Sequence, residues 1–410
     1  MRTKSRFRVG GIDAHLLVEQ FDTPLYVYDA SAIVQQYRKL RAAFARAPSR
    51  ILYAMKANSN SAILRLLRRQ GASVDAVSLG EVRLGVRAGF KPSEILYTPN
   101  SVPFREYREA VRLGAVVNID NISMLEQFGH EFGGSVPCAM RINPHVLAGG
   151  HSHVQTGHID SKFGISIHQM RHVHRIVKAH KMKIAGLHMH TGSEILDEGA
   201  FIASAEILFE TATEFSGLRF LDFGSGFKVK YRPDDIETNV TKLGVALIRR
   251  YRSFTREYGT KPEIWFEPGK YLVSESGCFL VRATVVKQTP STVFVGVDSG
   301  FNHLIRPMFY DAYHEILNIS NPKGVERVYS VVGNICETDT FASDRKLPEV
   351  RAGDVLCFKN AGAYGYSMSS QYNFHPRPAE VLVYKNKAHL IRSRETFDNL
   401  LNNEVYFEPD

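Results

Sequence analysis

The sequence predicts a (β/α)8 barrel of the TIM type, accompanied by a second, mostly β domain. The barrel is predicted because short apolar strand-like runs alternate with helical runs, and eight such units fit into about 220 residues, a typical size for this fold. The second domain is predicted because strand-like runs follow one another after residue 273 without a comparable helix. We expect the barrel over residues 30–273 and the β domain over residues 1–29 and 274–410. A doubly wound open sheet is the alternative, but its first strand should lead into a glycine-rich phosphate turn, and YAMKANSN (53–60) is not one.

The expected elements follow in chain order from hydrophobic periodicity and from capping residues. Barrel strands are expected at 51–55, 73–78, 95–99, 116–120, 137–144, 184–193, 219–227 and 264–273. Helices are expected between them at 59–72, 80–89, 101–114, 122–133 and 199–215. The N-terminal run 15–29 is strand-like and is expected to join the β domain.

Composition narrows the class of protein. A hydrophobic content of 44% with 23% charged residues is ordinary for a globular protein, and no apolar run approaches the roughly 20 residues of a membrane span. The net charge of +9 is dispersed over predicted helix faces, so we expect no nucleic-acid partner and no membrane partner. The four cysteines are widely spaced and form no CxxC pair, which favours free thiols and a cytoplasmic protein.

Chemically versatile side chains are concentrated where the predicted barrel strands end, which is where barrel enzymes place their active sites. The first expected strand leads into Lys56 and the second contributes Asp75. The sixth contributes His190 and Ser193, and the eighth contributes Glu267, Gly269 and Lys270. The Gly224–Ser225–Gly226 turn follows the seventh strand and could hold a phosphate through its backbone N–H groups.

These residues together describe a site for pyridoxal 5′-phosphate. A desolvated Lys56 could bind an aldehyde, Glu267 could keep a heteroaromatic nitrogen protonated, and His190 could stack on a ring. Taken alone, without the other residues, Lys56 is better explained as an ion-pair partner inside the barrel.

A metal-dependent hydrolase is the competing class of enzyme. His188 and His190 are two residues apart on a strand and could point the same way, with Asp75 and Asp222 available as further ligands. The HSH run at 151–153 lies in a polar segment and is expected to be a loop. The sequence offers no second histidine pair on a strand, so we expect no metal.

Seven motifs in order resemble the fold-type III pyridoxal-phosphate decarboxylases, from about residue 20 to residue 385. They are YAMKAN, SKFGI, GLHMHTGS, DFGSGF, EPGKYLV, NICETD and AGAYGYSMSSQYN. The resemblance implies an alanine-racemase-like barrel with a C-terminal β domain and a homodimer with active sites at the subunit interface.

The resemblance also implies roles for individual residues. Lys56 would bind the cofactor covalently, His190 would stack on its ring, Gly224 to Gly226 would hold its phosphate and Glu267 would face its ring nitrogen. Further cofactor contacts are expected from these residues: Asp75, Ser193, Gly269, Lys270 and Tyr364.

Other residues are implied in substrate binding and proton transfer. Cys336 would enter from the partner subunit and donate a proton after CO2 leaves, and Glu337 would bind a substrate ammonium group. Arg306, with Tyr310 beside it, would grip a distal carboxylate through two hydrogen bonds, while Lys270 and Tyr364 would also contact the substrate. These roles fit decarboxylation of a diamino acid, meso-2,6-diaminopimelate, to L-lysine.

Three departures from the family pattern bear on these expectations. Lys270 replaces the more common arginine and cannot form its bidentate fork; CETDT replaces CESGD; and GSG replaces GGG. The alternatives are a sister decarboxylase acting on carboxynorspermidine or another diamino acid, and a pyridoxal-phosphate-binding protein without decarboxylase activity. Racemisation would need a second base, for which the sequence offers no clear candidate.

Overall fold

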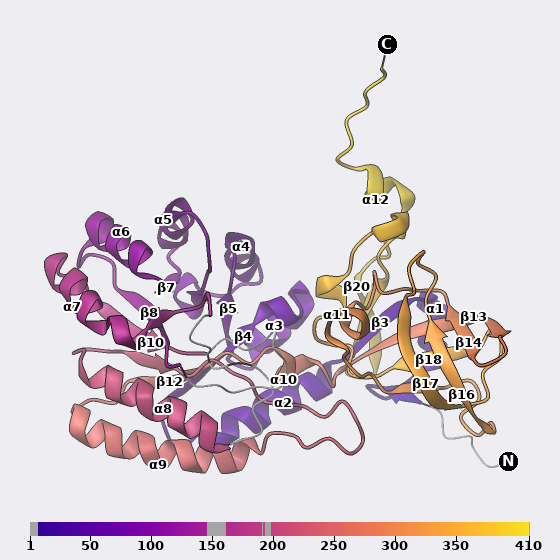
Figure 1. Ribbon diagram of the computed structural model, residues 1–410, viewed down its shortest axis with the longest axis horizontal. Coiled ribbons are helices and arrows are strands. Elements are labelled where there is room, and N and C mark those ends of the chain that lie inside the picture. The colour runs from indigo at the N-terminus through magenta and orange to yellow at the C-terminus, as the bar shows by residue number, and fades with distance from the viewer. Residues whose placement is uncertain (1–6, 146–160, 191, 193–197, 410) are drawn as a thin grey trace. The chain divides into compact units, whose positions relative to one another are not determined.

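The computed structural model describes residues 7–145, 161–190, 192 and 198–409 of the chain (Figure 1). These residues form two compact units. One contains residues 34–230 and 236–272, and the other contains residues 1–33, 231–235 and 273–410. Each unit has its own sheet and its own core.

The first unit is a closed barrel of eight parallel strands. The strands are β4 (Ser49–Ala54), β5 (Ser73–Ala76), β6 (Ile95–Tyr97), β7 (Val116–Ile119), β8 (Cys138–Asn143), β10 (Ile184–His188), β11 (Phe220–Asp222) and β12 (Glu263–Phe266). Their order is β10-β11-β12-β4-β5-β6-β7-β8, and the pairing of β10 with β8 closes the barrel. The short β9 (Ile165–Ser166) is added beside β8. The predicted barrel is confirmed.

Helices cover the outside of the strands (Figure 1). They are α2 (Ala30–Ala43), α3 (Ser61–Arg69), α4 (Leu79–Arg87), α5 (Phe104–Arg112), α6 (Ile122–Phe132), α7 (Met170–Ala179), α8 (Glu198–Thr213), α9 (Val240–Tyr258) and the short α10 (Lys270–Val273). Inside the barrel, side chains from several strands form one buried cluster, in which Phe220 of β11 stacks on Trp265 of the neighbouring β12 with 3.6 Å between ring centroids. The interior is therefore filled, and the site must lie at an end of the strands.

The second unit is built on a largely antiparallel sheet. Its strands are β3 (Leu25–Asp29), β13 (Gly277–Gln288), β14 (Val293–Val297), β15 (Ile316–Asn318), β16 (Glu326–Val332), β17 (Thr340–Pro348), β18 (Val355–Phe358), β19 (Ala379–Tyr384) and β20 (Lys387–Arg392). The main path is β17-β16-β14-β13-β3-β19-β20, with β18 also paired to β13. The N-terminal strand β3 lies between β13 and β19 and so completes this sheet. The short helix α11 (Arg306–Tyr310) lies between β14 and β15, and the short helix α12 (Phe397–Leu401) follows β20.

The expected strands 184–193 and 219–227 are shorter in the structure, ending at His188 and Asp222, and two further expectations assign the wrong type of element. The run 15–29 is not a continuous strand, because α1 (Ala14–Phe21) precedes β3 and the Asp13 side chain caps it by accepting the His15 N–H at 3.0 Å. The predicted strand 264–273 ends at Phe266, and Lys270 instead begins α10. Both runs are apolar, and apolar runs of this length do not distinguish a short buried helix from a strand.

Candidate active site

Lys56 stands where β4 ends. Ala54 is the last residue of the strand, and a single 3-10 turn over Met55–Ala57 carries the lysine. Asn60 then begins α3 by accepting the Ala62 N–H at 3.0 Å, so the residues from 54 to 61 form a short, hydrogen-bonded corner. The Lys56 side chain is 46% exposed, whereas we expected a buried, desolvated lysine. The amine therefore reaches out of the strand end towards solvent instead of into the core.

Asp75 is the buried partner of Lys56. The Lys56 Nζ lies 3.5 Å from Asp75 Oδ2, and Thr98 donates a hydrogen bond to Asp75 Oδ1. The Asp75 side chain is 1% exposed. Burial raises the pKa of Asp75, Glu267 raises it further, and Lys56 acts in the opposite direction. The ion pair that was the alternative role for Lys56 is thus present, and it holds the amine at the strand end.

Glu267 forms a second buried pair, with His188. Its Oε2 lies 3.0 Å from His188 Nε2, and both side chains are almost fully buried. Burial acts to raise the pKa of Glu267, but the pairing with His188 outweighs it and lowers the pKa to about 2. Glu267 Oε1 is buried without a hydrogen-bond partner among the described residues. Glu267 is therefore an ionised carboxylate with one oxygen available to a ligand.

Asp222 lies beside this pair and takes the opposite protonation state. Ligand atoms of Asp222, His188 and Glu267 lie within 4.8 Å of one another, and Asp222 is fully buried. Burial and the Glu267 charge raise the pKa of Asp222 well above its usual range. Two adjacent buried carboxyl groups cannot both ionise at low cost, so the proton stays on Asp222.

The Gly224–Ser225–Gly226 turn is built into the same network. Gly224 donates its N–H to Asp222 Oδ1 at 2.8 Å, and Ser225 donates its N–H to His190 Nδ1 at 3.2 Å. Gly224 has φ +61°, and a Cβ there would lie 2.6 Å from His190 Nδ1, so the turn requires glycine. Burial lowers the pKa of His190 to about 3, with Arg141 and Lys56 adding to the effect. His190 is thus a neutral ring that accepts a hydrogen bond from the turn.

The loop after β12 packs on the Lys56 corner. The Ala54 N–H donates to the Pro268 carbonyl at 3.3 Å, and a Cβ at Gly269 would lie 3.1 Å from both the Ala54 oxygen and the Ala57 Cβ. Lys270 follows as the half-buried first residue of α10. The strands β10, β11, β12 and β4 are successive neighbours, so their ends bring the predicted cofactor residues together. Ser193 lies outside the described residues.

Arg306 lies in the β unit and is buried, and no carboxylate in the described part of the chain pairs with it. Arg306 is 7% exposed. Its guanidinium carbon lies 5.1 Å from the centre of the Tyr231 ring and 6.0 Å from the centre of the Tyr310 ring. Its Nε has no hydrogen-bond partner among the described residues. Burial and the Arg306 charge lower the pKa of nearby His314 to about 3, so that ring does not compete for an anion as a cation. The described residues therefore provide a buried cation with no anion to balance it.

Cys336 and Glu337 are exposed at a loop of the β unit. Cys336 Sγ donates to Glu337 Oε2 at 3.3 Å, and the Tyr372 hydroxyl donates to the other oxygen of Glu337. The Tyr372 hydrogen bond lowers the pKa of Glu337 and raises that of Tyr372 to about 12. The sequence departure CETDT places Asp339 behind this loop, where its side chain accepts the N–H groups of Phe301 and Ile335. The buried Asp339 carboxylate thus links the backbone of this loop to the backbone of Phe301.

Tyr364 is half-buried in the β unit and has a left-handed backbone, with φ +56°. The segment around it packs tightly, since a Cβ on Gly362 would lie 1.8 Å from the Val273 oxygen. A left-handed backbone at a residue other than glycine persists where the surrounding structure holds it.

The proposed metal ligands are not brought together as the sequence suggested. The described residues group His188 with Asp222 and Glu267, while His190 instead accepts from the glycine turn. The HSH run at 151–153 lies outside the described residues.

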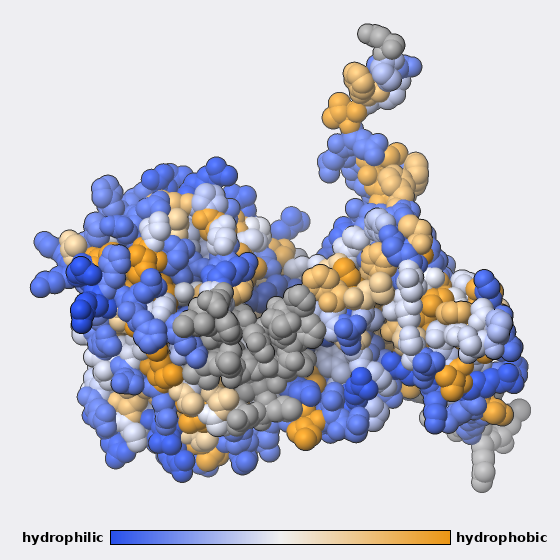
Figure 2. Space-filling model, viewed as in Figure 1, coloured by the Kyte–Doolittle hydropathy of each residue, from blue (hydrophilic) through white to orange (hydrophobic). Residues whose placement is uncertain are grey.

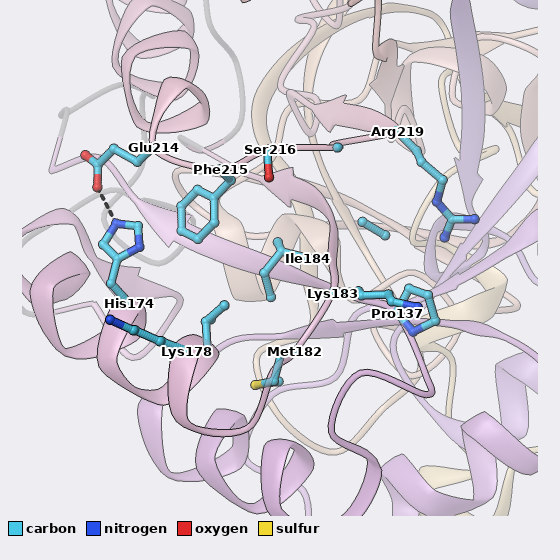
Figure 3. Close-up of a pocket in the computed structure, with 13 residues that line it drawn as sticks. Pro137, His174, Lys178, Met182, Lys183, Ile184, Glu214, Phe215, Ser216 and Arg219 are labelled. Carbon is cyan, nitrogen blue, oxygen red and sulfur yellow. Dashed lines mark hydrogen bonds and ion pairs between the residues drawn. The ribbon is translucent and has the colours of Figure 1, made fainter.

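A surface pocket of about 640 Å³ lies elsewhere in the barrel (Figure 3). It is lined by residues at the amino ends of strands, including Pro137, Ile184 and Arg219, and by the His174–Glu214 pair, whose atoms are 2.5 Å apart. In a barrel of parallel strands this is the end opposite Lys56. The pocket is thus separate from the candidate active site.

Sequence reasoning missed the partners that tune the predicted residues. His188, Asp222 and Thr98 were either assigned to a metal or not singled out, yet they set the charge of Glu267 and Asp75. Their position at strand ends was a usable signal, but which acid each of them contacts depends on the closure of the barrel.

A closed barrel with a lysine, a carboxylate and a glycine turn at its strand ends, together with a separate β unit, defines a class of pyridoxal-dependent enzyme. Residues 30–274 match the family model described as pyridoxal-dependent decarboxylase, pyridoxal binding domain. The chain belongs to this pyridoxal-dependent decarboxylase family, whose cofactor is pyridoxal 5′-phosphate.

Its relatives include diaminopimelate decarboxylases. The chain is 40% identical to the diaminopimelate decarboxylase of Methanothermobacter thermautotrophicus over 98% of this chain and 96% of the relative. A solved diaminopimelate decarboxylase of M. jannaschii is 32% identical, with a TM-score of 0.90 over 98% of this chain and 97% of its own. The Helicobacter pylori diaminopimelate decarboxylase complexed with L-lysine is 30% identical, with a TM-score of 0.87 over 95% of this chain and 98% of its own.

The residues at the barrel strand ends fit this cofactor. The unpartnered, ionised oxygen of Glu267 can accept a hydrogen bond from a protonated ring nitrogen. The Gly224 turn leaves no room for a side chain, as the close approach of a phosphate requires, although the Gly224 and Ser225 N–H groups here donate to Asp222 and His190. The Lys56 amine is accessible and has a carboxylate beside it.

Proposed function

We propose that the protein decarboxylates meso-2,6-diaminopimelate to L-lysine and CO2 with the help of pyridoxal 5′-phosphate. The observation that carries the choice of substrate is the buried Arg306, which has no anion beside it among the described residues. A buried, unbalanced charge is costly, so its retention favours a ligand that brings a carboxylate. Diaminopimelate carries a carboxylate and an ammonium group at its distal end, and ornithine and arginine lack that carboxylate.

The residues of the barrel would hold the cofactor and control its charge. The cofactor supplies an electron sink for the electrons left when CO2 departs. Lys56 would hold it through its side-chain amine, and Asp75, 3.5 Å from that amine, would keep the amine in position. Glu267, kept ionised by His188, holds the ring nitrogen protonated. His190 stacks on the ring as a neutral imidazole, so it does not compete for that proton.

Other contacts would orient the cofactor and the substrate. The Gly224–Ser225–Gly226 turn and Lys270 would bind the phosphate, with Asp75 and Gly269 completing the cofactor's surroundings. Tyr364 contacts both cofactor and substrate, and Lys270 lies within reach of the substrate. Tyr310 lies beside Arg306 at the distal carboxylate.

Cys336 would return a proton to the carbon that has lost CO2, and Glu337 would bind the distal ammonium group. We propose that both residues act in the partner subunit of a homodimer. Cys336, Glu337 and Tyr372 are exposed, which supports this proposal. A proton donor on the open surface can act on a bound substrate only when a second subunit brings an active site against it. Four free thiols, three of them buried, are compatible with the cytoplasm as the site of action.

The test is CO2 release from a panel of diamino acids, with and without added pyridoxal 5′-phosphate. We expect release from meso-diaminopimelate that depends on the cofactor, and little from ornithine or lysine. Release from lysine or ornithine at the same rate would contradict the proposed substrate, and no cofactor-dependent release from any of them would contradict the enzyme class.

Arg306→Ala is the sharper test of the substrate. Losing a charge-assisted, bidentate contact should raise KM for diaminopimelate by roughly a hundredfold. Arg306→Lys is the matched control, because it keeps the charge but not the planar fork, and should give an intermediate KM. Unchanged diaminopimelate turnover by Arg306→Ala would show that the carboxylate is bound elsewhere.

A further inference from the structure

The Cys336 loop is held by a residue from a distant part of the same unit. Asn373 lies in the short turn Tyr372–Phe374, 37 positions along the chain from Cys336. Its Oδ1 accepts the backbone N–H of Cys336 at 3.2 Å, and its Nδ2 donates to Cys336 Sγ at 3.3 Å. One side-chain amide thus fixes both the backbone and the thiol of the same residue.

Asparagine suits this position for two separate reasons. Its amide carries an acceptor and a donor on adjacent atoms, which is what the N–H and the sulfur of one residue require. The backbone at Asn373 is left-handed, with φ 52° and ψ 26°, a conformation that asparagine tolerates better than most residues. Aspartate would keep the acceptor and the backbone, but it would lose the donor to sulfur.

The thiol therefore has a partner on each side. Its S–H points to Glu337 Oε2 at 3.3 Å, and its sulfur receives the Asn373 N–H at 3.3 Å. Tyr372, adjacent to Asn373, donates to Glu337 and lies 4.0 Å from the sulfur through its hydroxyl. The turn Tyr372–Asn373 thus fixes the orientation of the thiol and of the neighbouring carboxylate together.

We propose that Asn373 is a positioning residue for Cys336, holding the thiol so that its proton can be delivered. The inference rests on the proposed function, in which the S–H bond breaks, a C–H bond forms at the carbon that lost CO2, and the S–H electron pair stays on sulfur. Asn373 Nδ2–H then continues to donate to a sulfur that has become negative, a stronger hydrogen bond than the one to the neutral thiol. Solvent returns the proton before the next turnover.

The test compares Asn373→Asp and Asn373→Gly in the full-length holoenzyme. The aspartate variant replaces the donor to sulfur by a carboxylate oxygen and so also adds a negative charge beside the thiol. The glycine variant removes both contacts without adding a charge and keeps a backbone that tolerates the left-handed conformation. Asn386→Asp is the matched control, because Asn386 also has a left-handed backbone, with φ 57°, but lies in the turn between β19 and β20.

Two readouts are measured. The first is the rate at which iodoacetamide, a reagent small enough to enter a substrate-free active site, alkylates Cys336, followed by mass spectrometry of its peptide. The other three cysteines are buried within the chain. The second is the division of the effect between kcat and KM for CO2 release. We expect Asn373→Asp to slow alkylation and lower kcat by about tenfold each, with KM within about twofold and the control unchanged.

Alkylation of Asn373→Asp at the wild-type rate would overturn the proposal, as would a rise in KM with kcat intact. Failure of the proposed function would look different. A Cys336→Ser enzyme with full kcat would remove the proton-donor role and with it the catalytic consequence for Asn373, whatever the alkylation rates of the Asn373 variants.

Discussion

Two groups of polar residues in this molecule are built in opposite ways. The strand-end cluster of the barrel, consisting of Asp75, His188, Asp222 and Glu267, is buried, with no member more than 8% exposed. The loop cluster of the β unit, consisting of Cys336, Glu337, Tyr372 and Asn373, is exposed throughout.

The difference lies in what sets the charge of each group. Burial is the largest influence on the pKa of every carboxyl group in the strand-end cluster, and their mutual contacts then decide which one is ionised. In the loop cluster the largest influence on the pKa of Glu337 and of Tyr372 is their mutual hydrogen bond. The charges of the strand-end cluster are therefore fixed when the chain folds, whereas those of the loop cluster depend on the surface that covers it.

A group of apolar residues is also exposed in the C-terminal segment, where Val405, Tyr406 and Phe407 are each more than 80% exposed. Figure 2 shows hydrophobic surface along this segment.

The largest expected effect comes from Lys56→Ala. Turnover should fall by on the order of a thousandfold or more, and the absorbance band of the lysine-bound cofactor should disappear, because no other described amine stands at the end of β4 beside Asp75. Lys183→Ala, at the amino end of the barrel strands, is the control and should leave both properties unchanged. A fully active Lys56→Ala enzyme would show that the strand-end cluster takes no part in the reaction.

The next largest effect is a difference in the free energy of unfolding between a variant of the strand-end cluster and a variant of the loop cluster. His188→Leu leaves Glu267 buried without its partner, and removing one member of a buried pair typically costs about 3–5 kcal/mol. Urea unfolding of the cofactor-free protein at neutral pH measures this loss. Tyr372→Phe removes the corresponding hydrogen bond from the loop cluster and should leave the unfolding midpoint unchanged, since both partners are solvated. Equal effects of the two variants would erase the distinction between the clusters.

A smaller effect concerns the proton on Asp222. A carboxyl group whose pKa is raised by folding binds its proton more tightly in the folded state, so it lowers stability progressively as pH rises above its unfolded value of 3.8. Asp222→Asn keeps the acceptor for the Gly224 N–H and removes this titration. The free energy of unfolding of the variant should therefore gain on that of the wild type as pH rises from 4 to 7, and the two should converge at lower pH.

The pH series has an internal check in Glu267. Its pKa is lowered in the folded state, so it stabilises the protein above its unfolded value of 4.5, and this contribution is lost as pH falls towards about 2. Both the wild type and Asp222→Asn should show that acid loss. A stability difference that does not change with pH would mean that Asp222 is not the protonated member.

The barrel could be predicted from sequence because each of its units carries a local signal. Apolar strands, the Asn60 cap and the strand-end glycines each act over a few residues, and eight repeats leave few alternatives. The strand prediction for residues 15–29 is wrong because the apolar run is compatible with either a helix or a strand, and the Asp13 cap favours the helix α1. In the site, Lys56 and Glu267 stand out by residue type and position.

What sequence could not supply is pairwise contact. That His188 serves Glu267, or that Asn373 holds Cys336 from 37 residues away, depends on how strands close and turns meet. The exposure of Lys56 is of the same kind: an apolar strand before a lysine suggests a buried amine, but the 3-10 turn carries it past the end of the strand.

The smallest effect is expected from Lys270→Arg, at the edge of the strand-end cluster. Lys270 is half-buried and begins α10, directly after Gly269, which packs on the Lys56 corner. An arginine there would gain a bidentate fork for a phosphate or carboxylate, so cofactor affinity or KM should improve by about two- to fivefold. Titration of the cofactor-free enzyme with pyridoxal 5′-phosphate and steady-state kinetics measure the two separately, with Lys183→Arg as control. A marked loss of activity would show instead that the space around Lys270 is fitted to the narrower ammonium group, and that the barrel cluster is as specific at its edge as at its centre.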